Sequence, residues 1–281
     1  MSSYRFCRTD DIELLVGALN RCWAPYFPGE PPATPASFKR SIRDLQVWCS
    51  SCMVAFSGPD PIGVLIGAKR PSGTLVYKLA VHPDHLRQGH GRHLLTSLGS
   101  KLAILGPPRI AAEVPDTLAP ARELFAASGY VEEALLTDYV LERGAEAGSG
   151  VAGRFVIPVT VDDLAANGLL PDPGQPVCWA RSVETLTARK GEIDGLAVAS
   201  DESIEACILY TPDGEVVFLR SFVEEDGARL AELLSRVCRP GIRTLTLPKV
   251  HPEEIAKELL ERLGFRPAGE HRVYATTARP A

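Results

Sequence analysis

Hydrophobic residues recur with two different periods along the first half of the chain, and this pattern predicts alternating strands and helices. Short apolar runs bounded by glycine, proline or charged residues are typical of strands. Five such runs lie near residues 53–57, 62–69, 74–82, 109–114 and 138–142. Leucines at helical spacing form one apolar face between two of these runs, and they are Leu94, Leu95, Leu98, Leu102 and Leu105. The order of elements predicts an α/β fold, of the α+β kind with a mixed sheet.

Polar residues, prolines and a glycine mark the ends of three other helices, which are expected near residues 10–20, 36–45 and 119–128. Asp10 and Glu13 have the spacing of a capping box at the start of the first helix. The proline-rich segment from Pro25 to Pro35 is expected to be an irregular loop. Gly129 is expected to end the last of these helices in the left-handed conformation.

The second half of the chain repeats the pattern of the first. ELFAASGY, which starts at Glu123, aligns with ELLERLGF from Glu258 at a shift of 135 residues. GTLVYKLAV, which starts at Gly73, aligns with GEVVFLRSF from Gly214 at a shift of 141 residues. The second copy is therefore six residues shorter between its strand and its last helix, and the segment corresponding to HPDHLRQGHGRH is the expected place. Two copies of this size predict paired domains.

The boundary between the copies is marked by composition. The stretch RGAEAGSGVAG consists mostly of glycine, alanine and serine, as linkers do. A chain of 281 residues is also near the upper limit for one hydrophobic core. We therefore expect a first domain over residues 1–143, a linker over 144–153, and a second domain over 154–281.

Composition and charge exclude several classes of protein. Hydrophobic residues make up 45% of the chain and charged residues 23%, as in an ordinary globular protein. A net charge of −5 disfavours broad affinity for nucleic acid or anionic membranes, which require clustered Lys and Arg. The polar N-terminus and the lack of long apolar runs predict a cytoplasmic protein without a membrane span. In such a compartment the seven cysteines are expected to be small buried hydrophobes, and the lone CxxC of Cys49 and Cys52 is not expected to bind metal.

The segment LAVHPDHLRQGHGRHLL, from Leu79 to Leu95, carries the clearest chemical signal. An apolar strand ends at Val81, and Gly89 and Gly91 then lead into the leucine-faced helix. The first turn of a helix has unpaired amides and a partial positive charge, and glycines let a ligand approach them. The segment therefore predicts a phosphate or pyrophosphate site. It contains neither a Walker loop nor a complete GxGxxG, because Leu94 stands at the third glycine position.

The same segment, followed by an EV strand and a helix that ends in a GY pair, resembles the GNAT superfamily of acyl-CoA-dependent N-acetyltransferases. The resemblance covers about residues 4–142, and more faintly 154–274, which implies two tandem GNAT-like acyl-CoA N-acyltransferase domains. It implies acetyl-CoA (coenzyme A) as cofactor, with the pantetheine arm added to a splayed strand. The implied contacts are Leu79, Ala80 and Val81 on the strand, and the main-chain amides of Arg87, Gln88, Gly89, His90, Gly91 and Arg92 around the pyrophosphate.

Acetyl transfer to an amine requires a base, a donor that stabilises the oxyanion, and an acid for the thiolate. The resemblance implies Glu113 as the base and the amide of Val81 as the oxyanion donor. Tyr77 or Tyr130 could supply the acid, although neither matches a family acid. The chain departs from the family pattern at three positions, Leu86, Leu118 and Phe125, and Phe125 cannot donate a proton.

Two further groups of residues have alternative interpretations. Four histidines crowd the glycine-rich segment (His82, His85, His90 and His93), but an anion-binding loop is a poor place for a cation, and no metal is expected there. Trp23, Tyr26 and Phe27 either line an acceptor pocket or pack against the proline-rich loop. In the second copy, Glu224, Glu225 and Asp226 stand where phosphate would lie and would repel it. That copy is expected to keep the fold without the cofactor.

The expected function is therefore that of an N-acetyltransferase (acyltransferase) that moves an acetyl group to an amine through a direct ternary complex. The expected acceptor is a small-molecule amine, and the expected assembly is a monomer or homodimer. The alternative is a non-catalytic relic that binds and senses acyl-CoA. A third interpretation is a protein-interaction scaffold that binds no ligand.

Overall fold

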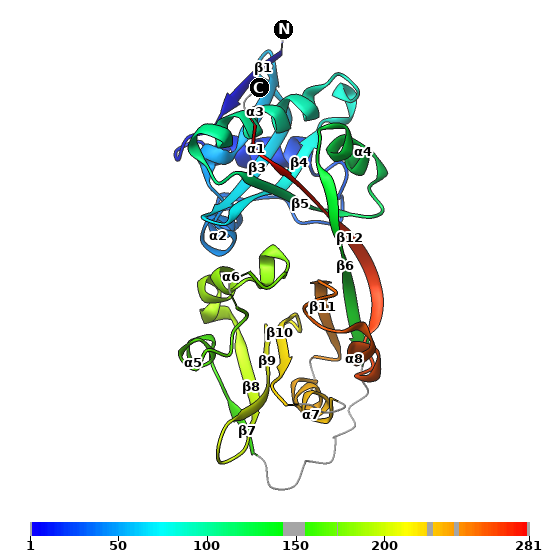
Figure 1. Cartoon of the computed structure of the whole chain (residues 1–281). Helices are drawn as coiled ribbons and strands as arrows, with labels where there is room; N and C mark the ends of the chain where they lie inside the picture. Colours follow the sequence, from blue (N-terminus) through cyan, green and yellow to red (C-terminus); the bar gives the residue numbers. More distant parts are fainter. Residues whose placement is uncertain (1, 143–154, 173, 224–226, 239–241, 280–281) are drawn as a thin grey trace. The chain divides into compact units, whose positions relative to one another are not determined.

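The structure is a computed structural model that describes residues 2–142, 155–172, 174–223, 227–238 and 242–279. Two compact units divide the chain. Unit 1 consists of Met1–Ala134 with Arg272–Ala281, and unit 2 consists of Leu135–His271 (Figure 1). The predicted linker, residues 144–153, lies outside the described residues.

The sheet of unit 1 is mixed, as the sequence predicted. Its strands lie in the order β1 (Ser2–Phe6), β2 (Met53–Ser57), β3 (Asp60–Arg70), β4 (Gly73–Val81) and β5 (Arg109–Pro115). Neighbours are antiparallel except β4 and β5, which are parallel. Next to β5 lies β12 (Arg266–Thr277), and next to β12 lies β6 (Val131–Glu142).

The helices of unit 1 lie close to their expected positions. They are α1 (Ile12–Cys22), α2 (Pro35–Leu45), α3 (His90–Leu105) and α4 (Ala119–Ala127), with short 3-10 turns η1 (Cys49–Ser51) and η2 (Pro83–His85). The expected capping box of Asp10 and Glu13 is wrong. Asp11 precedes α1 and makes no side-chain cap, because its carboxylate instead accepts the Arg8 amide and the Arg5 guanidinium. A capping box forms at α2, between Thr34 and Ser37.

The last strand of the chain completes the core of unit 1. β6 begins in unit 1 and continues into unit 2 beyond Ala134, whereas β12 begins in unit 2 and enters unit 1 at Arg272. Tyr274, on β12, is buried in the core of unit 1 and stacks on Phe125 at a centroid distance of 6.0 Å. The compact units are therefore not simple consecutive halves of the chain.

Unit 2 repeats the element order of unit 1. Its strands are β7 (Phe155–Pro158), β8 (Asp194–Ala199), β9 (Ile204–Tyr210), β10 (Val216–Ser221) and β11 (Thr244–Val250). Its helices are α5 (Val161–Ala166), α6 (Val183–Ala188), α7 (Ala228–Val237) and α8 (Lys257–Arg262), with turns η3 (Trp179–Arg181) and η4 (Lys190–Glu192). Strands β10, β9, β8 and β7 form an antiparallel sheet, and β11 pairs with β6.

Backbone geometry supports the internal repeat. Gly129 and Gly264 both have positive φ (81° and 90°) and end α4 and α8. In both copies the next amide donates to the carbonyl five residues earlier, as in a Schellman motif. Gly89 and Gly227 precede α3 and α7 at a shift of 138 residues. Only half of the six-residue difference therefore lies before the helix, which corrects the expected position, and α7 is also shorter than α3 (10 against 16 residues).

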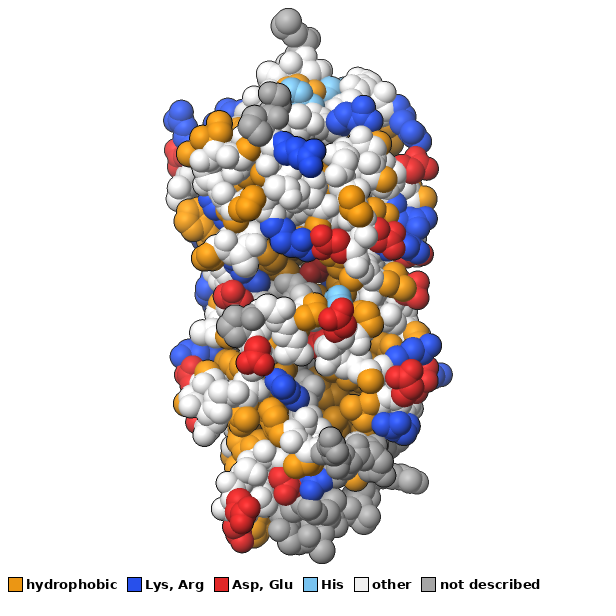
Figure 2. All heavy atoms as spheres, viewed as in Figure 1, with side chains coloured by type: hydrophobic (Ala, Val, Ile, Leu, Met, Phe, Trp, Pro, Cys, Tyr) orange, Lys and Arg blue, Asp and Glu red, His pale blue; other side chains and the backbone are white. Residues whose placement is uncertain are grey.

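Three global features bear on function. In the described part of the chain, no helix combines the length and apolarity that crossing a membrane requires. All seven cysteines are free thiols and all but Cys238 are buried, as expected, and burial raises the pKa of Cys22 to about 11. Side chains of both charges are interspersed on the face that Figure 2 draws.

Candidate functional site

Strands β4 and β5 diverge after a short stretch of pairing. Only Thr74 with Ile110 and Leu75 with Ala111 are in register, although β4 continues for six more residues. A bulge lies where the pairing stops, because Lys78 pairs with Ile66 and Val76 with Gly67, which leaves Tyr77 as the extra residue. A bulge bends and twists its strand, so it turns β4 away from β5. The result is a strand edge that faces a gap.

Alternation along β4 fixes which main-chain groups face this gap. The amide of His82 donates to Ile62 of β3 at 2.9 Å. Every second residue before His82 therefore points its main-chain N–H and C=O groups toward β3. Ala80, in register with Val64, is one of them. Leu79 and Val81 turn their amides and carbonyls to the other edge. Of the three strand residues expected to meet the cofactor, Leu79 and Val81 therefore offer hydrogen-bonding groups to the gap.

The glycine-rich loop after β4 leaves its amides unused. Arg87 and Gly89 both have positive φ, 61° and 85°, and α3 begins at His90 without a side-chain cap. Within the described residues, no amide of residues 87–92 donates a hydrogen bond to the protein. Consecutive amides with alternating backbone conformation at a helix N-terminus form a concave anion site. The loop therefore has the backbone geometry that anion-binding loops share.

The two loop glycines do different work. A Cβ at Gly91 would lie 2.8 Å from Leu124 of α4, so Gly91 allows the two helices to pack closely. A Cβ at Gly89 would meet nothing within 4 Å, so the space beside its amide is open. Arg87 and Arg92 are both exposed at this opening, and Arg87 makes only a long, solvated ion pair with Glu123, at 3.8 Å.

His90 contributes its side chain to the core and not to the opening. Its ring is 5% exposed, and Nδ1 lies 2.7 Å from the Tyr4 hydroxyl. Nε2 is buried without a hydrogen-bond partner in the protein. Burial, and then the nearby His85 and His93, lower the pKa of His90 below its usual value, so the ring is neutral. Among the described residues, no set of three or more His, Cys, Asp and Glu side chains is arranged to hold a metal.

The residues expected to move protons lie in different environments. Ile110, Ala112 and Val114 of β5 are buried in the core, so alternation turns the half-buried Glu113 to the opposite face. Tyr77 is half-buried at the bulge. Tyr130 is in the core, and burial raises its pKa above the usual range, so it is not available to a ligand.

Phe125 is also a core residue, packed edge-to-face on Tyr130 at 5.1 Å and stacked on Tyr274. A side chain held between two rings is fixed by packing. The position at which the family often has a tyrosine therefore serves the core of unit 1 here.

The loop between α1 and α2 reaches the free edge of β4. The Tyr26 hydroxyl donates to the carbonyl of Val81 at 2.6 Å. Trp23 and Phe27 stack at a centroid distance of 4.3 Å and line a small pocket together with Glu30 and Lys78. Trp23 and Phe27 therefore both line a pocket and pack on each other, whereas Tyr26 contacts β4; that the pocket takes an acceptor stays a prediction.

Glu30 and Lys78 were missed by the sequence analysis. The Glu30 carboxylate accepts hydrogen bonds from Trp23 and from Lys78, each at 3.0 Å. The Lys78 ammonium also lies 4.2 Å from the centre of the Trp23 ring, within the range of a cation–π contact. The one available signal was a lysine inside an otherwise apolar strand.

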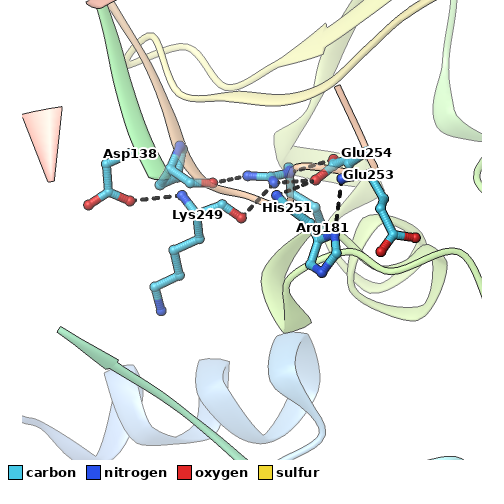
Figure 3. Close-up of polar contacts among 7 residues, drawn as sticks. Asp138, Arg181, Lys249, His251, Glu253 and Glu254 are labelled. Carbon is cyan, nitrogen blue, oxygen red and sulfur yellow. Dashed lines mark hydrogen bonds and ion pairs between the residues drawn. The ribbon is translucent and has the colours of Figure 1, made fainter. Parts of the chain in front are cut away.

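The corresponding strands of unit 2 have a buried arginine beside them. β10 and β11 share a single bridge, between Glu215 and Thr246. Arg181, on the turn η3 that contacts β10, is 1% exposed and donates to the main-chain carbonyls of Pro248 and Lys249. It also forms a bidentate pair with the buried Glu254 (Figure 3). The guanidinium thus binds main-chain groups of β11 and the Glu254 carboxylate.

The same network holds an irregular stretch of β11. Lys249 has φ 55°, and its amide donates to Asp138 at 2.8 Å. The amides of His251 and Glu253 donate to Glu254 and to the His251 ring respectively. Figure 3 shows the Lys249 and His251 side chains turned away from the Arg181 guanidinium. A non-glycine residue in this conformation is maintained by surrounding contacts, and for Lys249 these come from Asp138 and Arg181.

The start of α7 in unit 2 is also covered. A Cβ at Gly227 would lie 2.8 Å from Leu259, within α8, and 3.4 Å from Leu263, just after α8. Arg229, at the position that corresponds to Gly91, is buried in an ion pair with Glu205. The acidic residues expected to repel phosphate, 224–226, lie outside the described residues.

Comparison with known proteins finds one family model and several solved structures that are similar to this chain. Residues 16–130 match the model of the Acetyltransferase (GNAT) family. No curated protein matches the chain. Among solved structures, the chain is similar to a tandem GNAT protein from the clavulanic acid biosynthesis pathway, at a TM-score of 0.71 and 18% identity over 100% of both chains.

Two further solved structures resemble the whole fold. A GCN5-related N-acetyltransferase from Sphaerobacter thermophilus superposes at a TM-score of 0.72, with 15% identity over 100% of this chain and 96% of the other. A putative acetyltransferase from Pyrococcus horikoshii gives 0.62, with 17% identity over 99% and 90%. The family model thus matches within unit 1, and the solved structures show that the whole chain has the fold of these GNAT-type proteins.

Proposed function

We propose that the protein is an acyl-CoA-dependent N-acetyltransferase with a single cofactor site, in unit 1. One observation carries this proposal: the unused amides of residues 87–92 lie beside the open position at Gly89, directly after a strand edge that β5 does not pair with beyond Leu75. A pyrophosphate fits such amides, and an extended arm that carries amide groups fits such an edge. The thioester of bound acetyl-CoA would supply the activated acetyl group.

The residues of this chain would then bind, orient and move protons. The amides of residues 87–92 hold phosphate oxygens, and exposed Arg87 and Arg92 add positive charge. Leu79 and Val81 would orient the arm along β4, and the amide of Val81 or Leu79 would donate to a thioester oxygen. Glu113, on the half-buried face of β5, is the candidate base for the acceptor amine.

The acceptor would enter beside the loop between α1 and α2. The pocket lined by Trp23, Phe27 and Glu30 also includes Lys78 of β4, and Tyr26 contacts the edge of the same strand. An aromatic pair next to a carboxylate suits an amine that also has an apolar part. The proposed acceptor is accordingly a small-molecule amine.

Calorimetry with acetyl-CoA tests the cofactor site. Wild-type protein should bind one molecule per chain, and Gly89→Glu should weaken binding about 100-fold or more, because a carboxylate would stand against the phosphates. Gly58→Glu is the matched control: Gly58 also has positive φ (59°) and open space around it, but lies at the turn between β2 and β3. Equal affinity in both variants, or no binding by the wild type, would reject the proposal.

The relic interpretation keeps one specific observation in its favour. Phe125 is packed in the core and Tyr130 is buried beside it, so neither can protonate a leaving thiolate. A relic would bind acetyl-CoA at the same loop without transferring the acetyl group. Release of coenzyme A thiol in the presence of a panel of amines separates the two, because a relic gives tight binding and only background release.

A further inference from the structure

We propose that Tyr26 acts as a latch, in which its hydroxyl holds residues 23–30 on the free edge of β4 until the arm of acyl-CoA takes the same edge. The inference rests on the proposed cofactor site. It makes Tyr26 a positioning residue that couples cofactor binding to the shape of the pocket lined by Trp23 and Phe27.

The position of the Tyr26 contact carries the argument. The carbonyl of Val81 belongs to the edge that faces the gap, because the His82 amide pairs with β3 and groups alternate along the strand. Tyr26 donates to this carbonyl at 2.6 Å. Of the residues on this edge, Val81 is the nearest to the glycine-rich loop. An arm that runs from that loop along β4 must therefore pass Val81 before it reaches Leu79.

The contact is of a kind that a ligand can exchange. Tyr26 is 39% exposed and makes one neutral hydrogen bond to the strand. A ligand amide at Val81 would replace that bond with an equivalent one at little net cost. Burial raises the pKa of Tyr26, so the hydroxyl stays protonated and can donate throughout the neutral range.

The same segment is attached to β4 at a second point, and this attachment links the latch to the pocket. Glu30 and Trp23 both contact the Lys78 ammonium, three residues before Val81. Release of Tyr26 would leave Lys78 as the polar contact between residues 23–30 and β4, and Trp23 and Phe27 could then adjust. The acceptor pocket would thus take its final shape after the cofactor has bound.

The experiment compares Tyr26→Phe with the wild type in the full chain, with free coenzyme A as the probe. Calorimetry should show about five-fold tighter binding by Tyr26→Phe, because the ligand no longer competes with a hydroxyl. Tyr139→Phe, which removes a buried hydroxyl in unit 2, is the control and should bind as the wild type does.

A second readout follows the loop itself. In a Trp48→Phe, Trp179→Phe background, Trp23 is the single tryptophan. Coenzyme A should change its emission when Tyr26 is present, and Tyr26→Phe should show the changed emission before any ligand is added.

The outcomes separate the two proposals. If the wild type does not bind coenzyme A, the cofactor site and the latch both fail. If the wild type binds but Tyr26→Phe has the same or weaker affinity, or Trp23 does not respond, the latch is wrong and the cofactor site stands. The latch is supported if Tyr26→Phe binds coenzyme A more tightly than the wild type does, and if coenzyme A changes the Trp23 emission only in protein that retains Tyr26.

Discussion

The two units contain the same gap between diverging strands but treat it in opposite ways. In unit 1 the strand edge is met by one partly exposed tyrosine hydroxyl, and the amides before α3 open onto space beside Gly89. In unit 2 the buried Arg181 guanidinium binds a β11 carbonyl and Glu254, and leucines lie close to Gly227 before α7. Both units thus contain the diverging pair of strands. Whether the edge of the strand is accessible depends on the side chain that contacts these strands in each unit, which is Tyr26 in unit 1 and Arg181 in unit 2.

The largest effect is expected from Arg181→Ala, which removes the buried partner of Glu254 in unit 2. Removing one partner of a buried pair leaves Glu254 uncompensated, so the free energy of unfolding should fall by about 3–5 kcal/mol. Urea unfolding measures this change. Arg262→Ala, an exposed arginine on α8, should stay within about 0.5 kcal/mol.

Arg181→Lys keeps the charge without the bidentate geometry. Its loss in free energy of unfolding should lie between those of Arg181→Ala and Arg262→Ala, which separates lost pairing from general misfolding. The stoichiometry of acetyl-CoA binding by these variants should remain one per chain. A second binding event would contradict the comparison, because it would mean that only Arg181 excludes ligand from unit 2.

An intermediate effect is expected from Phe125→Tyr, which restores the residue type of the family in unit 1. The added hydroxyl must fit between the rings of Tyr130 and Tyr274, so stability should fall by about 1–3 kcal/mol without a gain in turnover. Thermal unfolding and thiol release measure the two. Phe218→Tyr, at a buried phenylalanine of unit 2, controls for overpacking. A clear rise in turnover would show that position 125 does reach the reacting groups.

The smallest effect concerns pH and the buried His90 of unit 1. Its pKa is lowered in the folded protein, so below about pH 6.5 the unfolded chain takes up a proton that the folded protein does not. Stability should therefore fall as pH drops from about 7 to 5. His90→Gln should flatten the fall in melting temperature over this window, whereas Asp11 and Asp116, whose pKa values are lowered by arginines, titrate below it in both proteins. Equal slopes would show that His90 does not titrate differently on folding.

Much of unit 1 could be predicted from the sequence because its signals are local. The spacing of Leu94, Leu98 and Leu102 defines the buried face of α3, and Gly129 stops α4 where expected. The glycine-rich loop was also predicted from a local signal, since Gly89 and Gly91 stand directly before the leucine-faced helix. The capping box at Asp10 failed for a local reason as well, because Asp11 found partners at Arg5 and Arg8.

The sequence alone determined the element order, the internal repeat and the position of the glycine-rich loop, all of which depend on residues close together in the chain. Tertiary structure decided that Tyr274 fills the core around Phe125, that Tyr26 reaches Val81, and that Arg181 pairs with Glu254. These partners are 55 to 149 residues apart. Side-chain type does not reveal such pairs, because only the path of the strands brings them within contact distance.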